Sequence, residues 1–165
     1  HYMAPMVQKY LNQSSWLPYI KLVHEEILLG TGGTILRNYD FFKDETFLVA
    51  HADNLTIFNL SDFKNRHHNR PKGTEITAMV FETLDPHSCG IVELDSNSVV
   101  QAFHEKVDNP PSNLANGAVY ILEPSVLNWM IGLGKKQVDL LMPQYVLHQI
   151  FWLAMKTIYL LRHDL

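Results

Sequence analysis

The chain has 165 residues, of which 47% are hydrophobic and 18% are charged, and its formal net charge is −4. This composition excludes a disordered or fibrous protein and predicts one globular domain over residues 1–165. The negative charge gives no reason to expect nucleic-acid binding. The single cysteine, Cys89, excludes an internal disulfide and fits a cytoplasmic protein. We see no secretory leader, and the longest apolar run near the end, 150–155, is too short to span a membrane.

The first half of the chain alternates helical and extended patterns. In chain order we expect a helix over 3–11, a strand over 19–24, a turn-rich segment over 25–34, a short helix within 35–42, a buried strand over 47–50 and a helix over 60–69. Asn59 or Ser61 caps the last of these helices, Phe63 is its inward anchor, and its basic run over 64–70 faces solvent. Trp16 and Trp129 are expected to be packing residues.

The second half is richer in strands. We expect strands over 75–82, 90–94, 98–104, 115–122 and 157–161, and helices over 125–131 and 140–155. The strands 90–94 and 98–104 flank Asp95-Ser96-Asn97, which is typical of a hairpin turn. Helices that alternate with strands before a hairpin predict an α/β protein with a mainly parallel sheet and some antiparallel pairing.

One strand end carries the strongest functional signal. The apolar run Phe47–Ala50 leads directly into His51-Ala52-Asp53-Asn54. In an open α/β sheet, ligands are held at the carboxyl ends of strands, and a carboxylate there suits Mg²⁺ and its phosphate ligands. The alternative is that Asp53 caps the next helix or turn, which aspartate does well.

Five motifs, in order along the chain, resemble those of one enzyme family. They are LLGTGGT at 28–34, FLVAHADN at 47–54, CGIVELD at 89–95, FHEK at 103–106 and LANGAVYILEPSVL at 114–127. Together they are similar to the sugar-phosphate nucleotidylyltransferases, especially the mannose-1-phosphate guanylyltransferase-like branch. The resemblance covers about residues 1–140. It implies a three-layer Rossmann-like nucleotidyltransferase fold with a mixed, mainly parallel sheet. It also implies transfer of a nucleoside monophosphate from a nucleoside triphosphate, GTP favoured, to a sugar 1-phosphate such as mannose 1-phosphate, with release of pyrophosphate.

The resemblance assigns a nucleotide side and a metal to the site. It implies that Asp53 is catalytic and binds Mg²⁺, and that Gly30, Thr31, Gly32 and Gly33 form a loop that approaches the nucleotide. Glycines suit this role because they let the backbone come close to a flat base. The alternative is a plain glycine turn before a helix that Thr34 caps. Glu25 is interpreted as structural.

The sugar-phosphate side is implied in the same way. The residues are Gly90, which leaves room for the sugar, Glu105, which accepts hydrogen bonds from sugar hydroxyls, Lys106, a catalytic cation that neutralises the phosphate, and Asn116, which reaches the sugar. The alternatives are a strand bend at Gly90 and an exposed ion pair of little energetic value at Glu105 and Lys106. Asparagine is disfavoured inside strands, so Asn116 needs a reason.

The chain also departs from the family pattern. The family's opening strand with its GxGTRL-type loop, its Pro-Lys-Pro segment and its second Asp-x-Gly-Thr turn have no counterpart in the 165 residues, and Asp164 is not assigned as the second metal ligand. We therefore expect an inactive fragment or a degenerate relative. Its exposed sheet edge would pair with a second copy or another chain. The alternatives are a non-catalytic sugar-phosphate or nucleotide-binding protein and an assembly partner.

Overall fold

The computed structural model describes residues 3–137 and 158–162, with side chains described up to residue 132. In chain order its elements are α1 (Ala4–Asn12), the 3₁₀ helix η1 (Leu17–Tyr19), α2 (Gly30–Arg37), α3 (Tyr39–Phe42), β1 (Phe47–Ala50), α4 (Leu60–His68), β2 (Ile76–Glu82), the 3₁₀ helix η2 (Pro86–Ser88), β3 (Gly90–Leu94), β4 (Val100–Glu105), β5 (Leu114–Leu122), α5 (Ser125–Gln137) and β6 (Ile158–Arg162). The helix expected over 140–155 lies outside the described residues.

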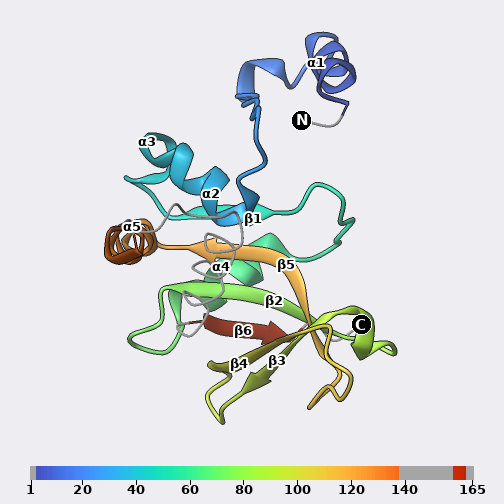
Figure 1. Cartoon of the computed structure of the whole chain (residues 1–165), viewed down its shortest axis with the longest axis vertical. Helices are drawn as coiled ribbons and strands as arrows, with labels where there is room; N and C mark the ends of the chain where they lie inside the picture. The colour runs from blue at the N-terminus through green and yellow to red at the C-terminus, as the bar shows by residue number, and fades with distance from the viewer. Residues whose placement is uncertain (1–2, 138–157, 163–165) are drawn as a thin grey trace.

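Six strands form one sheet in the order β4-β3-β5-β2-β6, and β1 also pairs with β5 (Figure 1). The prediction of an α/β protein with a mixed sheet is confirmed. The prediction of mainly parallel pairing is wrong for the described strands, because only β2 and β6 pair in parallel. A parallel pair needs a long crossover, but between β2 and β5 the chain makes only a hairpin and short loops. As a result, β5 lies antiparallel between β1 and β2.

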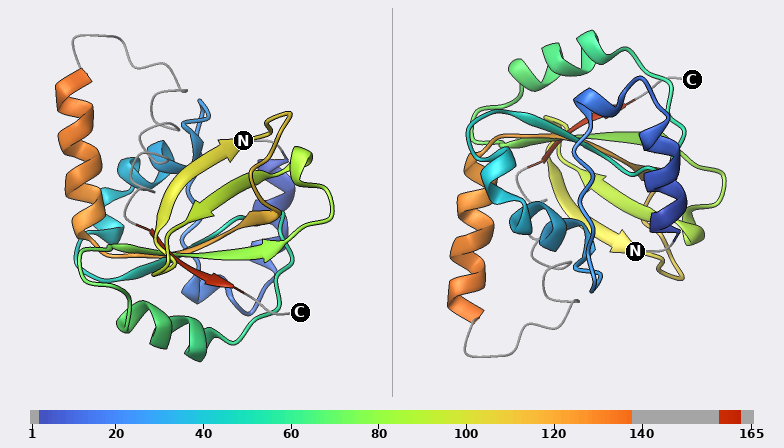
Figure 2. Two further views of the ribbon diagram at one scale, coloured as in Figure 1. Left: turned by 90° about the horizontal axis from the view of Figure 1, so that it is seen from below. Right: turned by 90° about the horizontal axis from the view of Figure 1, so that it is seen from above.

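The sheet separates two apolar clusters, so the described fold has three layers (Figure 2). On one face, alternate residues of β2 and β5 pack with Ile35 of α2 and with Leu127 and Met130 of α5. On the other face, Met79, Val119 and Ile121 pack with Phe63 of α4, which is fully buried as predicted. Side chains alternate between the two faces of a strand, and both faces of β2 and β5 are covered. This explains the near-continuous apolar runs in these two strands.

The segment that follows α1 differs from the prediction. Residues 20–24 form no strand but an extended connection that follows η1, and α1 contains no buried residue. Figure 1 shows α1 apart from the sheet. Trp16 is 68% exposed and makes an edge contact with the Tyr19 ring, and Trp129 is 41% exposed, so neither belongs to the buried core of the described residues. Within the described residues, no helix is long and apolar enough to cross a membrane.

A polar network fastens α4 to the sheet. Nδ1 of His67 lies 2.8 Å from Oγ1 of Thr77, and Nε2 lies 3.0 Å from Oε1 of Glu123. The same Glu123 oxygen lies 2.9 Å from Nη2 of Arg70, and its other oxygen accepts a 2.8 Å hydrogen bond from Thr46. The basic run was predicted to be solvated, but His67 is buried because its ring finds polar partners on both sides.

Folding shifts the pKa values of two members of this network. Burial, helped by the charge of Arg70, lowers the pKa of His67 below 6.5. Burial alone would raise the pKa of Glu123, but the hydrogen bonds from Thr46 and His67 and the charge of Arg70 together outweigh it and lower this pKa below 4.5. At neutral pH a neutral imidazole therefore donates its Nε2–H to a carboxylate.

Candidate functional site

The sheet opens along one edge of β5, and this opening forms the candidate site. On that edge, Ala115 pairs with Ile91 of β3, and Val119 pairs with Ala50 of β1. Residues 116–118 lie between these two partners. On the other edge, the register with β2 shifts over the same stretch, which is an irregularity of the β-bulge type. Such bulges are enriched beside functional sites because they re-aim side chains.

The side chain of Asn116 is held by hydrogen bonds within the bulge. The Oδ1 of Asn116 accepts a 3.2 Å hydrogen bond from the backbone N–H of Ala118, which has a positive φ of 53°. Its Nδ2 donates a 2.6 Å hydrogen bond to the hydroxyl of Tyr120. A Cβ atom on Gly117 would come within 3.1 Å of the carbonyl oxygen of Met79, so the close strand contact favours glycine there. The asparagine inside the strand therefore stabilises the bulge.

Asp53 reaches the same opening from the end of β1. The backbone N–H of His51 donates a 3.2 Å hydrogen bond to the carbonyl of Ala118, and Asn54 N–H closes a turn onto the carbonyl of His51 at 3.3 Å. The exposed Asp53 lies within this turn. The next helix, α4, is capped by Asn59, so Asp53 does not cap that helix; the alternative that Asp53 serves the turn stays open.

The strand that leads to Asp53 is less buried than predicted. Its burial alternates between half-buried and exposed residues, and Leu48 is 42% exposed. Among the described strands β1 pairs only with β5, so no described strand covers its other edge. An apolar run does not by itself show burial on both faces, because burial also depends on the neighbouring elements.

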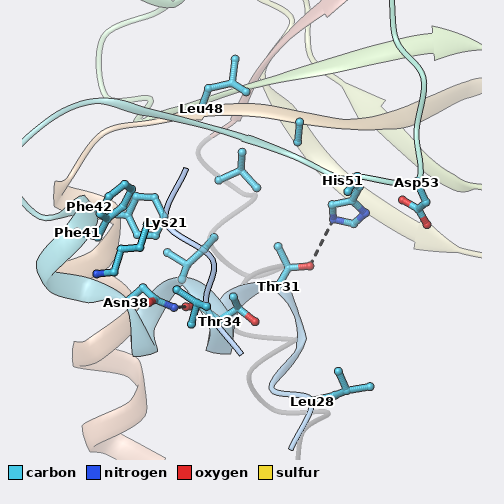
Figure 3. Close-up of a pocket in the computed structure, with 15 residues that line it drawn as sticks. Lys21, Leu28, Thr31, Thr34, Asn38, Phe41, Phe42, Leu48, His51 and Asp53 are labelled. Atoms are coloured by element: carbon cyan, nitrogen blue, oxygen red, sulfur yellow. Dashed lines mark hydrogen bonds between the residues drawn. The ribbon is translucent and has the colours of Figure 1, made fainter. Parts of the chain in front are cut away.

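Asp53 lines two pockets. A pocket of about 620 Å³ is shared by Asp53, Asn116 and Gly117. A second pocket of about 960 Å³ has Asp53, His51 and Thr31 toward one end, as Figure 3 shows, and Phe41 farther along. Oγ1 of Thr31 lies 3.4 Å from Nε2 of His51, which links α2 to the end of β1. The structure thus places Asp53 between Asn116 on one side and Thr31 on the other.

The predicted glycine loop is instead the start of a helix. Gly30, Thr31, Gly32 and Gly33 form the first turn of α2, and Gly32 and Gly33 are buried. Of these four, Thr31 lines the larger pocket. Thr34 does not cap the helix, because it lies inside it. The carboxylate of Glu25 accepts a 3.4 Å hydrogen bond from Leu29 N–H at the start of this helix, which agrees with a structural role.

Three of the four predicted sugar-phosphate residues, Gly90, Glu105 and Lys106, lie at the ends of β3 and β4, whereas Asn116 lies on β5. Gly90 pairs with Glu105, and Lys106, which has a positive φ of 49°, donates its backbone N–H to Cys89 at 3.3 Å. A Cβ on Gly90 would overlap the Phe103 ring. Gly90, Glu105 and Lys106 do not line either described pocket that holds Asp53.

Glu105 is nevertheless close enough to influence the hydroxyl that holds Asn116. Burial raises the pKa of Tyr120 to about 12, and the Glu105 carboxylate contributes to the same shift. The Tyr120 hydroxyl, which accepts a hydrogen bond from Asn116, therefore lies within the electrostatic range of the Glu105 carboxylate. Sequence reasoning missed Tyr120, although a tyrosine in a buried strand usually needs a partner for its hydroxyl.

A magnesium ion fits this site only if substrate supplies ligands. The described residues contain no group of three or more His, Cys, Asp or Glu side chains that could hold a metal. Asp164 lies outside the described residues. Mg²⁺ commonly keeps several waters and takes one or two carboxylates together with substrate phosphates. A single exposed carboxylate such as Asp53 suits that kind of shared ion and not a cage made of protein alone.

Comparisons with known proteins agree with this architecture. A family model described as "Nucleotidyl transferase" matches residues 1–143. A mannose-1-phosphate guanylyltransferase of Mycobacterium tuberculosis is 31% identical over 66% of this chain, which covers 30% of that protein. The catalytic subunit beta of the Drosophila melanogaster mannose-1-phosphate guanylyltransferase is 30% identical over 77% of this chain and is covered over 35% of its length. The chain thus spans about a third of the length of these curated relatives.

Solved structures show the same fold. A Bacillus anthracis protein assigned as a glucose-1-phosphate thymidylyltransferase, solved with sucrose, matches with a TM-score of 0.72 at 15% identity over 98% of this chain and 64% of its own. HddC from Yersinia pseudotuberculosis, complexed with GMP-PN, matches with a TM-score of 0.62 at 19% identity over 76% of this chain and 54% of its own. The motifs, the Rossmann-like α/β fold and the family match lead to one conclusion: this chain belongs to the nucleotidyl transferase family, among the sugar-phosphate nucleotidylyltransferases.

Proposed function

We propose that this chain forms the metal and sugar-phosphate side of a sugar-1-phosphate nucleotidylyltransferase. The reaction would join a nucleoside monophosphate to a sugar 1-phosphate and release pyrophosphate. The observation that carries the proposal is the pocket that Asp53 and Asn116 share where the sheet opens. GTP and mannose 1-phosphate are the first substrates to test, because several relatives are named mannose-1-phosphate guanylyltransferases.

We assign each site residue a role in this reaction from the chemistry of its side chain. Asp53 would hold Mg²⁺, which neutralises phosphate charge when it is bound. Lys106 would act as a catalytic point charge beside the sugar phosphate. Glu105 and Asn116 would bind sugar hydroxyls, and Thr31 would lie on the nucleotide side. The attacking group is the phosphate oxygen of the sugar 1-phosphate, so positioning and charge neutralisation supply most of the catalysis.

The 165-residue polypeptide alone should not release pyrophosphate from GTP and mannose 1-phosphate. The sequence holds no glycine-rich loop of the kind that cradles the triphosphate in the family it resembles. Pyrophosphate release above the rate of a Lys106→Ala variant would contradict this expectation.

A thermal-shift panel tests the proposal. Ligands that bind only the folded state raise the melting temperature, so mannose 1-phosphate and GTP with Mg²⁺ should each do so. Asp53→Asn should remove the Mg²⁺-dependent part of the GTP effect. Asp44→Asn makes the same charge change at an exposed aspartate outside both pockets that hold Asp53, and it should leave the effect intact. No stabilisation by any sugar 1-phosphate or nucleotide would refute the proposal.

The open edge of β1 supports a second candidate function, pairing with another chain. Among the described strands β1 has β5 as its one partner, and the 960 Å³ pocket lies along Leu48, Val49 and Ala50. An unpaired strand edge beside an apolar groove favours addition of a further strand. Light scattering across a concentration series should detect self-association. A monomer at all concentrations would leave only pairing with a different chain.

A further inference from the structure

The side-chain amide of Asn116 is fixed at both ends. The backbone N–H of Ala118 can only donate, so the group that faces it at 3.2 Å must be the acceptor Oδ1. The Nδ2 end therefore faces Tyr120, whose hydroxyl oxygen accepts the 2.6 Å hydrogen bond. These two contacts settle which end of the amide points in each direction.

The group that holds the Nδ2 end is rigid. Tyr120 is 1% exposed, and its ring belongs to the apolar cluster that includes Ile76 and Leu127. Its position on β5 is set by pairing with Ala78 of β2 and Val49 of β1. Buried rings in a packed sheet have little freedom, so the hydroxyl is a fixed acceptor. Burial raises the pKa of Tyr120 further above physiological pH, to about 12, so the hydroxyl is protonated.

Two hydrogen-bonding positions of the amide are left over. A carboxamide offers two N–H donors and two lone pairs, and each of the two contacts uses one of them. Asn116 lines the 620 Å³ pocket. One donor beside one acceptor matches a hydroxyl group, which also does both, whereas a phosphate oxygen only accepts.

We propose that Tyr120 is a positioning residue that orients Asn116 to bind a sugar hydroxyl of the sugar 1-phosphate. The inference rests on the proposed function, and it adds a residue that touches no substrate itself. It makes a specific claim: the Tyr120 hydroxyl acts on sugar binding and not on nucleotide binding.

The test uses the full 165-residue chain and calorimetric titration with two probes, mannose 1-phosphate and GTP with Mg²⁺. Tyr120→Phe keeps the ring and removes the hydroxyl. It should weaken mannose 1-phosphate binding about five- to tenfold, because one hydrogen bond is worth about 1 kcal/mol. GTP affinity should stay within about twofold, whereas general loosening of the fold would weaken both probes.

A second tyrosine–asparagine pair provides a matched control. The hydroxyl of Tyr39 donates a 3.2 Å hydrogen bond to Oδ1 of Asn128, so Tyr39→Phe removes a tyrosine–asparagine contact outside the described pockets. It should leave both affinities unchanged. Equal binding of mannose 1-phosphate by Tyr120→Phe and the original chain would overturn the inference. Failure of the original chain to bind any sugar 1-phosphate would instead overturn the proposed function.

A second measurement covers the case in which Tyr120→Phe does not fold. The side-chain NH₂ signals of Asn116 can be followed by NMR in the unmodified chain during titration with mannose 1-phosphate. The two amide protons should exchange slowly with solvent, and their chemical shifts should change as the sugar phosphate saturates the site. Unchanged signals at saturation would overturn the inference.

Discussion

Replacing Glu123 by alanine should be one of the costlier single changes to the stability of this domain. The carboxylate accepts from Thr46 at 2.8 Å and lies 3.0 Å from His67 and 2.9 Å from Arg70, and its side chain is only 24% exposed. Glu123→Ala leaves the buried imidazole N–H without its acceptor, which costs about 1–3 kcal/mol, and it also removes an ion pair.

The cost should stay below the full loss of a buried ion pair, about 3–5 kcal/mol. Arg70 loses this counter-ion but keeps two other hydrogen bonds, to the carbonyls of Thr74 at 2.6 Å and His67 at 2.9 Å, so its guanidinium donors stay partly satisfied. We therefore expect a loss of about 2–4 kcal/mol. For a chain of this size that corresponds to a fall of about 5–15 °C in the melting temperature.

Urea denaturation followed by circular dichroism at pH 7.5 measures this loss as a change in the free energy of unfolding. Glu93→Ala is the matched control, since Glu93 also pairs with a histidine, His104, but on the exposed β3–β4 hairpin. Its loss should not exceed about 1 kcal/mol. A Glu123→Ala cost below 1 kcal/mol, or equal costs for the two variants, would refute the reasoning from burial.

Three further predictions follow from the described side chains. Folding lowers the pKa values of His67 and Glu123, so the stability that each group contributes is fully present above its unfolded pKa. The free energy of unfolding should therefore fall as the pH drops below 6.5, and again as it drops below 4.5. Urea denaturation at a series of pH values measures this, and an unchanged free energy of unfolding from pH 7.5 to 4 would contradict it. Gly90→Ala should destabilise the chain by about 1–3 kcal/mol in the same assay, because the new methyl overlaps a phenylalanine ring. Gly132→Ala on α5 meets none of the described atoms and should gain up to about 1 kcal/mol. Equal effects of the two changes would argue against the close packing at β3. Asn59→Ala should lose about 1 kcal/mol by removing the cap of α4, and an unchanged urea midpoint would show that the cap contributes nothing.

Local physical chemistry let the sequence predict most of the described helices and strands. The short apolar runs within 75–82 and 115–122 located β2 and β5, and Asn59 marked the start of α4, because strand propensity and capping depend on a few neighbouring residues. The same holds for the hairpin at Asp95, whose Oδ1 accepts from the backbone of the turn. The polar turn at Asp53 also lies directly after the predicted strand.

Only the tertiary structure decided how these parts meet. The pairing of β5 with β1 and β2 made the centre of the sheet antiparallel. The break in strand pairing at residues 116–118 placed Asp53 and Asn116 in one pocket. The same arrangement left β1 with no second partner among the described strands, and it buried His67 among polar partners. Burial and pairing depend on residues far apart in the chain, such as Asn116 and Asp53, and no local pattern carries that information.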